Sequence, residues 1–153
     1  MKLSERVARV KPSATLAINA KAKALKQQGV HIVNFGVGEP DFDTPKHIQD
    51  AAIQAMREGH TRYTAVGGID ELKDAIRHAT NQDYGLSYHR ENVLVSCGGK
   101  HALFNFFQAV LDAGDEVIIP APYWVSYPDM VELTGGTSVI VPCPEEHDFK
   151  LRP

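Results

Sequence analysis

The chain has 153 residues, of which 43% are hydrophobic and 23% charged, a composition typical of a globular protein with a sizeable core. Its net charge of −3 argues against a nucleic-acid-binding protein, which would carry a basic stripe, and no apolar run is long enough to cross a membrane. The N-terminus lacks the apolar centre of a signal peptide and the two cysteines form no CxxC motif, so we expect a cytoplasmic protein.

The first part of the chain predicts a helix, a strand and a second helix. Apolar residues at helical spacing predict a helix over residues 14–28, which Gly29 ends. Residues 30–35 (VHIVNF) predict a short strand, and the turn-rich loop GVGEPDFDTP follows. Pro45 opens the next helix, because a proline in the first turn lacks an N–H that would have no partner there. We expect the apolar residues of this helix to face a core, namely Ile48, Ala52, Ile53 and Met56.

The rest of the chain predicts alternating helices and strands. Residues 69–85 predict an amphipathic helix with Ile69, Leu72 and Ile76 on one face. From residue 92 to residue 142 the expected order is strand, helix, strand, helix, strand, which indicates βαβ crossovers and a parallel sheet. The helix that follows the middle strand contains Pro128, which is tolerated if it falls in the first turns.

These elements predict an α/β fold with a three-layer αβα arrangement and a mainly parallel sheet. Three strands are few for a parallel sheet that must be covered on both faces. We therefore expect that the sheet is completed elsewhere or that the chain is part of something longer.

The stretch NVLVSCGGKHALFNFF, residues 92–107, leads from a strand through Gly98 and Gly99 into an apolar helix. A helix start leaves backbone N–H groups without partners and carries a partial positive charge. Neither glycine nor Cys97 caps such a start well, and glycine lets a ligand approach the backbone closely. The stretch predicts either a phosphate-binding turn or a tight turn capped by water. Cys97 is expected to be a small buried residue under this turn.

Two common phosphate motifs do not fit the sequence. A P-loop would need glycine where Leu94 stands and serine or threonine where His101 stands. A dinucleotide fingerprint starting at Gly36 would need its third glycine at Asp41. The seven histidines show no spacing that predicts a metal site.

Three stretches, NFGVGEPDFDTP, TRYTAVGGIDELKDAI and SCGGKHALFNFFQAVLDAGDEVIIPAPYW, together resemble the class I aminotransferases, enzymes of fold type I that use pyridoxal 5′-phosphate. These motifs are most similar to those of the bacterial branch that uses aspartate and, in some members, prephenate. The resemblance covers essentially the whole chain and matches the N-terminal portion of the family. It implies that residues 1–45 form an N-terminal arm, helix and strand of the small domain, and that residues 46–153 form the first part of the large cofactor-binding domain.

The resemblance implies roles for several residues at the cofactor. The backbone at Gly98, Gly99 and Lys100 matches the turn that holds the cofactor phosphate. Trp124 matches the aromatic residue that stacks on the pyridine ring, which suits a flat indole. Tyr63 matches a tyrosine whose hydroxyl reaches the phosphate in the neighbouring subunit, and this implies a homodimer with shared active sites. Without the resemblance, Trp124 would be a core residue and Tyr63 a surface aromatic.

Further residues match positions that touch the substrate, together with Trp124. Gly38 matches a glycine whose N–H meets the α-carboxylate. Lys100 matches a lysine that reaches the distal carboxylate of a dicarboxylic substrate, and Lys11 matches a position tied to prephenate use. Both lysines would otherwise be solvated surface charges. His101 stands where glutamine is commoner in this branch, and we assign it no function.

The resemblance therefore implies a transaminase that moves an amino group between an amino acid, aspartate or glutamate, and a 2-oxo acid. In the family, the Schiff-base lysine, the acid facing the pyridine nitrogen and the arginine that binds the α-carboxylate come after the stretch seen here. We assign no catalytic residue and predict that the chain alone does not transaminate. The alternatives are a lyase, decarboxylase or synthase of the same fold type, a non-catalytic phosphate-binding module, and a truncated portion of a larger chain.

Overall fold

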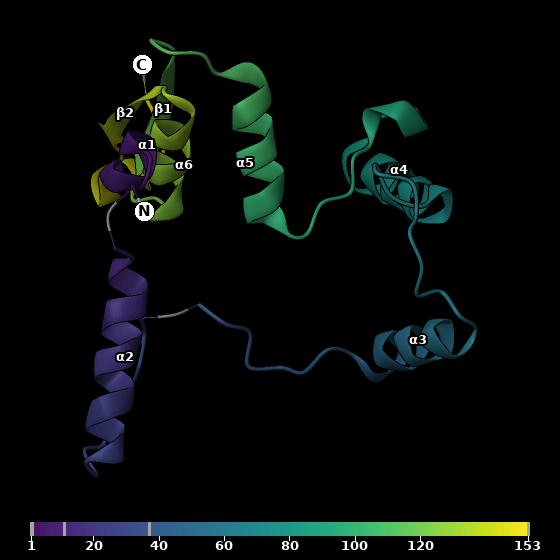
Figure 1. The fold of residues 1–153 in the computed structure, drawn as a ribbon, viewed down its shortest axis with the longest axis horizontal. Coiled ribbons are helices and arrows are strands. Elements are labelled where there is room, and N and C mark those ends of the chain that lie inside the picture. Colours follow the sequence, from purple (N-terminus) through teal and green to yellow (C-terminus); the bar gives the residue numbers. More distant parts are fainter. Residues whose placement is uncertain (1, 11, 37, 153) are drawn as a thin grey trace. The chain divides into compact units, whose positions relative to one another are not determined.

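The computed structural model of the chain describes residues 2–10, 12–36 and 38–152. Contacts divide the chain into two compact units, whose elements are labelled in Figure 1. Unit 1 combines residues 1–37 with residues 97–153, and unit 2 consists of residues 38–96. Among the described residues, no helix has the length and apolar character needed to span a membrane.

Unit 1 contains a parallel strand pair with helices. Its elements are α1 (Glu5–Arg9), α2 (Ala14–Gln27), α5 (Gly99–Val110), β1 (Glu116–Ala121), α6 (Ser126–Thr134), β2 (Thr137–Pro142) and the 3-10 turn η2 (Glu145–His147). The register of the strands runs from Glu116 opposite Thr137 to Ala121 opposite Pro142. Helix α6 connects the two strands, packs on both, and also contacts α1 and α5 (Figure 1).

The buried core of the described residues lies in this strand–helix–strand segment of unit 1. Val131 on α6 has no exposed surface, and Met130 beside it and Ile119 on β1 are each 4% exposed. Cys143, which follows β2, is 2% exposed. Apolar burial stabilises a fold by about 25 cal/mol per Å², so these side chains fix α6 against the strand pair.

The helix predicted over residues 14–28 is confirmed as α2, with both ends set by local chemistry. The Ser13 hydroxyl accepts a hydrogen bond from the Leu16 N–H at 3.3 Å, which caps the start. Gly29 has φ +82°, and the Val30 N–H donates to the Leu25 carbonyl at 3.1 Å, which closes the end.

Unit 2 contains α3 (Lys46–Arg57), α4 (Asp70–Tyr84) and the 3-10 turn η1 (Arg90–Asn92). Pro45 is the N-cap of α3, and Gly85 ends α4 in the left-handed region at φ 69°. Both predicted helices of this unit are therefore confirmed. Gly68, with φ +99°, approaches Val95 so closely that an added Cβ would lie 2.5 Å from that side chain, so a larger residue would displace it.

Two predicted strands are wrong. Residues 30–35 form no strand, and the Asn34 amide instead donates to Asn19 Oδ1 on α2 at 2.9 Å. Residues 93–95 also form no strand, although the Val95 N–H donates to the Gly67 carbonyl at 3.0 Å. A strand needs a ladder of backbone hydrogen bonds to a neighbour, and neither segment has one within the described chain.

The inward orientation predicted for the apolar face of α3 is also wrong. On α3, Ile48, Ala52, Ile53 and Met56 are exposed, and on α4 the same holds for Ile69, Leu72 and Ile76. Helical periodicity identifies an apolar stripe but does not supply the surface that covers it.

The predicted fold class is confirmed in its incomplete form, a helix-rich chain with a short parallel pair. Pro128 is the third residue of α6 and so lies in the first turn, where a proline is expected to be tolerated. Helix α1 and the turn η2 were not anticipated, and both are too short for a periodic signal.

Candidate functional site

The candidate site begins at the N-terminus of α5, in unit 1. Gly98 is the N-cap, with φ +86° and ψ 167°, a conformation that favours glycine. Neither it nor any other described residue provides a side-chain cap there. A Cβ added at Gly98 or Gly99 would meet no described atom within 4 Å. The helix start is therefore open to a ligand, with backbone N–H groups as its donors.

An aromatic residue lies beside this helix start. Trp124 follows the carboxyl end of β1, the edge at which α/β folds bind ligands. The Lys100 ammonium, from the first turn of α5, lies 4.7 Å from the centroid of the Trp124 ring, which is cation–π distance. Tyr127 meets the indole edge-on, with ring centroids 5.5 Å apart at 87°. Two stretches that lie 24 positions apart in the sequence thus come together.

His101 is a residue of this turn that sequence reasoning passed over. Its Nδ1 accepts a hydrogen bond from the Cys97 N–H at 3.1 Å. A histidine in the first turn of a helix can reach back to the chain before it, but residue spacing does not determine the direction of its side chain, so no signal in the sequence pointed to this contact. Cys97 itself is exposed, so its expected burial under the turn is wrong.

The other predicted site residues lie elsewhere. Gly38 and Tyr63 belong to unit 2, and their roles stay predictions. The Tyr63 side chain is fully exposed, so within the described chain its hydroxyl is available to another molecule. Lys11 lies outside the residues that the structure describes.

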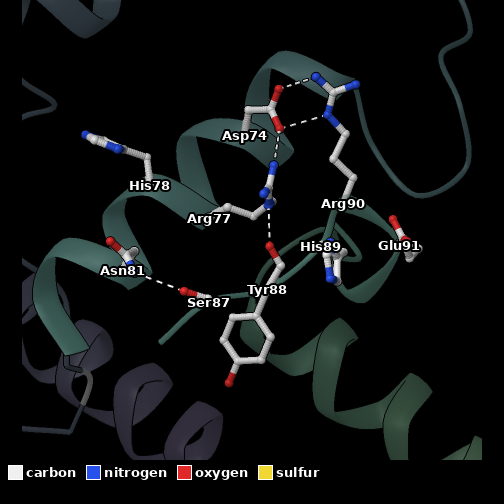
Figure 2. A pocket seen from close by; sticks show the side chains of 9 residues that line it. All are labelled: Asp74, Arg77, His78, Asn81, Ser87, Tyr88, His89, Arg90 and Glu91. Atoms are coloured by element: carbon white, nitrogen blue, oxygen red, sulfur yellow. Dashed lines mark hydrogen bonds and ion pairs between the residues drawn. The ribbon is translucent and has the colours of Figure 1, made fainter. Parts of the chain in front are cut away.

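A hollow of about 670 Å³ lies in unit 2, and the side chains that line it are drawn in Figure 2. It is lined by Asp74, Arg77, His78, Asn81, Ser87, Tyr88, His89, Arg90 and Glu91. Arg90 donates to both oxygens of Asp74 and, through Nη1, to Asp70 at 3.0 Å. Arg77 donates to Asp74 at 2.8 Å and to the Tyr88 carbonyl. Both guanidinium groups are thus paired with carboxylates, and Arg77 also with a backbone carbonyl. The residues that line the hollow therefore form an ion-pair cluster that holds η1 to α4.

The same pairing changes the acid strength of the cluster. The hydrogen bond from Arg90 lowers the pKa of Asp74 to about 2, with smaller contributions from Arg77. Asp74 in turn raises the pKa of Arg90. Both groups therefore stay charged at neutral pH, which suits a structural role and not proton transfer.

In the ranges 2–10, 12–36 and 38–152, no group of three or more histidine, cysteine or acidic residues is placed to hold a metal ion. The chemistry that the arrangement at α5 offers is instead that of anion binding beside an aromatic face.

Comparison with known proteins decides the family. The family model described as "Aminotransferase class I and II" matches residues 30–153. The chain belongs to the class I and II aminotransferases. The family resemblance predicted from the glycine turn and the surrounding motifs is thereby confirmed.

Individual aminotransferases are similar over the whole chain. The aspartate aminotransferase of Geobacillus stearothermophilus is 56% identical over 153 residues, and the aspartate/prephenate aminotransferase of Nitrosomonas europaea is 54% identical over 153 residues. The structure of the aspartate aminotransferase from Thermus thermophilus with maleate matches 99% of this chain and 40% of that one, with 50% identity and a TM-score of 0.94. The chain spans 39% and 38% of the lengths of the two relatives named first.

Proposed function

We propose that the protein carrying this sequence is a pyridoxal-phosphate-dependent transaminase acting between a dicarboxylic amino acid, aspartate or glutamate, and a 2-oxo acid. The observation that carries the proposal is the contact of Lys100 with Trp124 beside an open, uncapped helix start. Relatives named aspartate and aspartate/prephenate aminotransferases support the substrate class. Because the chain spans about 39% of such a relative, the activity is proposed for the whole protein.

The residues at α5 fit the cofactor. The backbone N–H groups of residues 98–100 donate to the phosphate, whose charge the helix dipole also favours. A Cβ added at Gly98 or Gly99 would meet no described atom within 4 Å, which supports an approach of the phosphate to this backbone. Trp124 is 43% exposed and so has ring surface left for stacking on the pyridine. When bound, pyridoxal phosphate supplies an aldehyde that takes the amino group and a ring that withdraws electrons.

The same elements orient the substrate. The Lys100 ammonium is a compact charge on a flexible stem, suited to the distal carboxylate of aspartate or glutamate. Trp124 borders the substrate as well as the cofactor. The Gly38 N–H donates to the α-carboxylate, and Lys11 is proposed to act when prephenate is the substrate.

We also propose a cytoplasmic homodimer in which Tyr63 donates its hydroxyl to the phosphate in the partner subunit. The full exposure of Tyr63 supports this role, because nothing within its own described chain uses the side chain. Residues 1–45 are assigned to the arm and small domain, and residues 46–153 to the first part of the large domain.

The test is a transaminase assay of the complete protein with aspartate and 2-oxoglutarate. We expect oxaloacetate and glutamate in equal amounts, dependent on pyridoxal phosphate. Release of a decarboxylated or deaminated product would instead indicate a lyase or decarboxylase of the same fold type. Cofactor binding without any product would indicate a non-catalytic binding module.

The 153-residue chain alone is expected not to transaminate. None of the residues assigned here forms a Schiff base or moves the substrate's α-proton, and transamination requires both steps. Turnover by the purified chain at a rate comparable with the complete protein would contradict this assignment.

A further inference from the structure

His101 turns back over the start of its own helix. It is the third residue of α5 after the N-cap Gly98, and its Nδ1 accepts the Cys97 N–H at 3.1 Å. In a capping box, a glutamate or glutamine at this third position reaches back to the N–H of the N-cap. His101 makes a related backward bond, but its partner is the N–H of Cys97, which lies one residue before the N-cap Gly98.

The forward half of such a box is missing at this turn. Gly98 has no side chain that could accept from the first N–H groups of the helix. The first backbone bond across the turn joins the Ala102 N–H to the Gly98 carbonyl at 3.1 Å. His101 therefore secures the chain before the turn and leaves the donors that precede Ala102 to a ligand.

Two adjacent glycines make this turn difficult to keep in one conformation. Glycine loses more backbone freedom on ordering than any other residue. A ligand that had to order residues 98 and 99 itself would lose affinity, whereas a turn that is already held binds more tightly. The hydrogen bond between Cys97 and His101 joins the residues on either side of the two glycines and so restricts the backbone conformation of both.

We infer that His101 is a positioning residue for the phosphate-binding turn, acting through the Cys97 N–H and not by contact with the phosphate. The role requires an imidazole whose Nδ1 is unprotonated, with its hydrogen on Nε2. The inference rests on the proposed function, since it takes the glycine turn as the seat of the cofactor phosphate.

The test compares two substitutions in the complete protein. His101→Leu removes the acceptor, while His101→Gln supplies an amide oxygen that can take the same bond. We expect His101→Leu to speed hydrogen exchange at the Cys97 amide and to weaken binding of inorganic phosphate and pyridoxal phosphate to the apoprotein, each by about fivefold. His101→Gln should stay close to wild type in both measurements. His78→Leu, which alters an exposed histidine on α4, is the matched control and should change neither.

Equal behaviour of the leucine and glutamine variants, or wild-type exchange at Cys97 in the leucine variant, would overturn the role of His101. A lower midpoint of global unfolding in His101→Leu, with unchanged phosphate affinity, would show a cap for stability alone and would also overturn it. If the wild-type apoprotein binds neither phosphate nor pyridoxal phosphate, the proposed function fails, and the inference fails with it.

Discussion

Different forces stabilise the two units of the chain, each within itself. Unit 1 has a small apolar interior, in which Val131 on α6 is completely buried. Unit 2, all of whose residues the structure describes, contains no buried residue. Its helix α4 is joined to η1 by the ion pairs of Arg90 with Asp74 and Asp70. Exposed ion pairs contribute little to stability, so unit 2 depends more than unit 1 on surfaces outside itself.

The difference also separates the proposed roles. Unit 1 carries the glycine turn and Trp124, which need a fixed geometry to bind a cofactor. Unit 2 carries Tyr63 on an exposed loop, where a side chain can reach another subunit. We therefore expect substitutions of buried residues in unit 1 to act through folding, and substitution of Tyr63 in unit 2 to act through the proposed shared site.

The largest effect is expected from the interior of unit 1. Met130→Ala should lower the free energy of unfolding by about 2–5 kcal/mol, because it removes buried contacts and leaves a cavity. Denaturant titration measures the change. Glu132→Ala, at an exposed position of the same helix, is the control and should stay within about 0.5 kcal/mol of wild type. Similar losses for both variants would mean that the interior of unit 1 does not dominate its stability.

The next effect tests whether unit 2 completes a site across subunits. Tyr63→Phe should weaken pyridoxal phosphate binding by about 1.5–3 kcal/mol, the value of a hydrogen bond to a charged group. Equilibrium titration of the complete apoprotein measures the affinity. Tyr84→Phe alters another exposed tyrosine of the same unit and should leave it unchanged. Unaltered affinity in Tyr63→Phe would remove this residue from the site.

A smaller effect is expected at the contact between Lys100 and Trp124. Lys100→Met should release the indole from the cation, an interaction of about 0.5–1 kcal/mol at an exposed site. Because Trp124 is the single tryptophan of these 153 residues, fluorescence quenching of the 153-residue chain reports on it directly. Lys100→Arg keeps the cation and should preserve the wild-type quenching. Identical quenching in the methionine variant would show that the lysine does not rest on the ring.

The smallest effect concerns the acid dependence of unit 2. The pKa of Asp74 is lowered from 3.8 to about 2, so its contribution to stability is present above pH 3.8 and is lost as the pH falls towards 2. Added salt should weaken this stabilising contribution of Asp74 at neutral pH, because salt screens the ion pairs. Asp74→Asn should remove this acid dependence, as shown by amide exchange in η1 between pH 2 and 5. The control Asp83→Asn, at the exposed end of α4, should leave it in place.

Local sequence signals predicted the helices well. Gly29 after α2 and Pro45 at the start of α3 mark helix ends that depend on neighbouring residues alone. The order of β1, α6 and β2 also followed from the sequence, since a strand–helix–strand pattern indicates a parallel crossover.

Non-local features were harder to predict. Residues 30–35 carry a strand-like composition, yet the Asn34 side chain bonds to Asn19 of α2, and no partner strand lies beside the segment in the described chain. The apolar stripe of α3 predicted burial, which depends on a covering surface elsewhere. At the proposed site, the glycine turn and Trp124 are predictions that come from the family motifs. The cation of Lys100 over the indole and the backward bond of His101 depend on side-chain directions that residue spacing does not determine.

The strand pair of unit 1 has a further consequence for handling the 153-residue chain. Strands β1 and β2 pair with each other, and within the described residues neither has a second neighbour. Each outer edge therefore presents backbone donors and acceptors that can recruit another strand. In concentrated refolding mixtures of the 153-residue chain, such edges favour intermolecular strand addition, and dilution should shift the yield towards the monomeric chain.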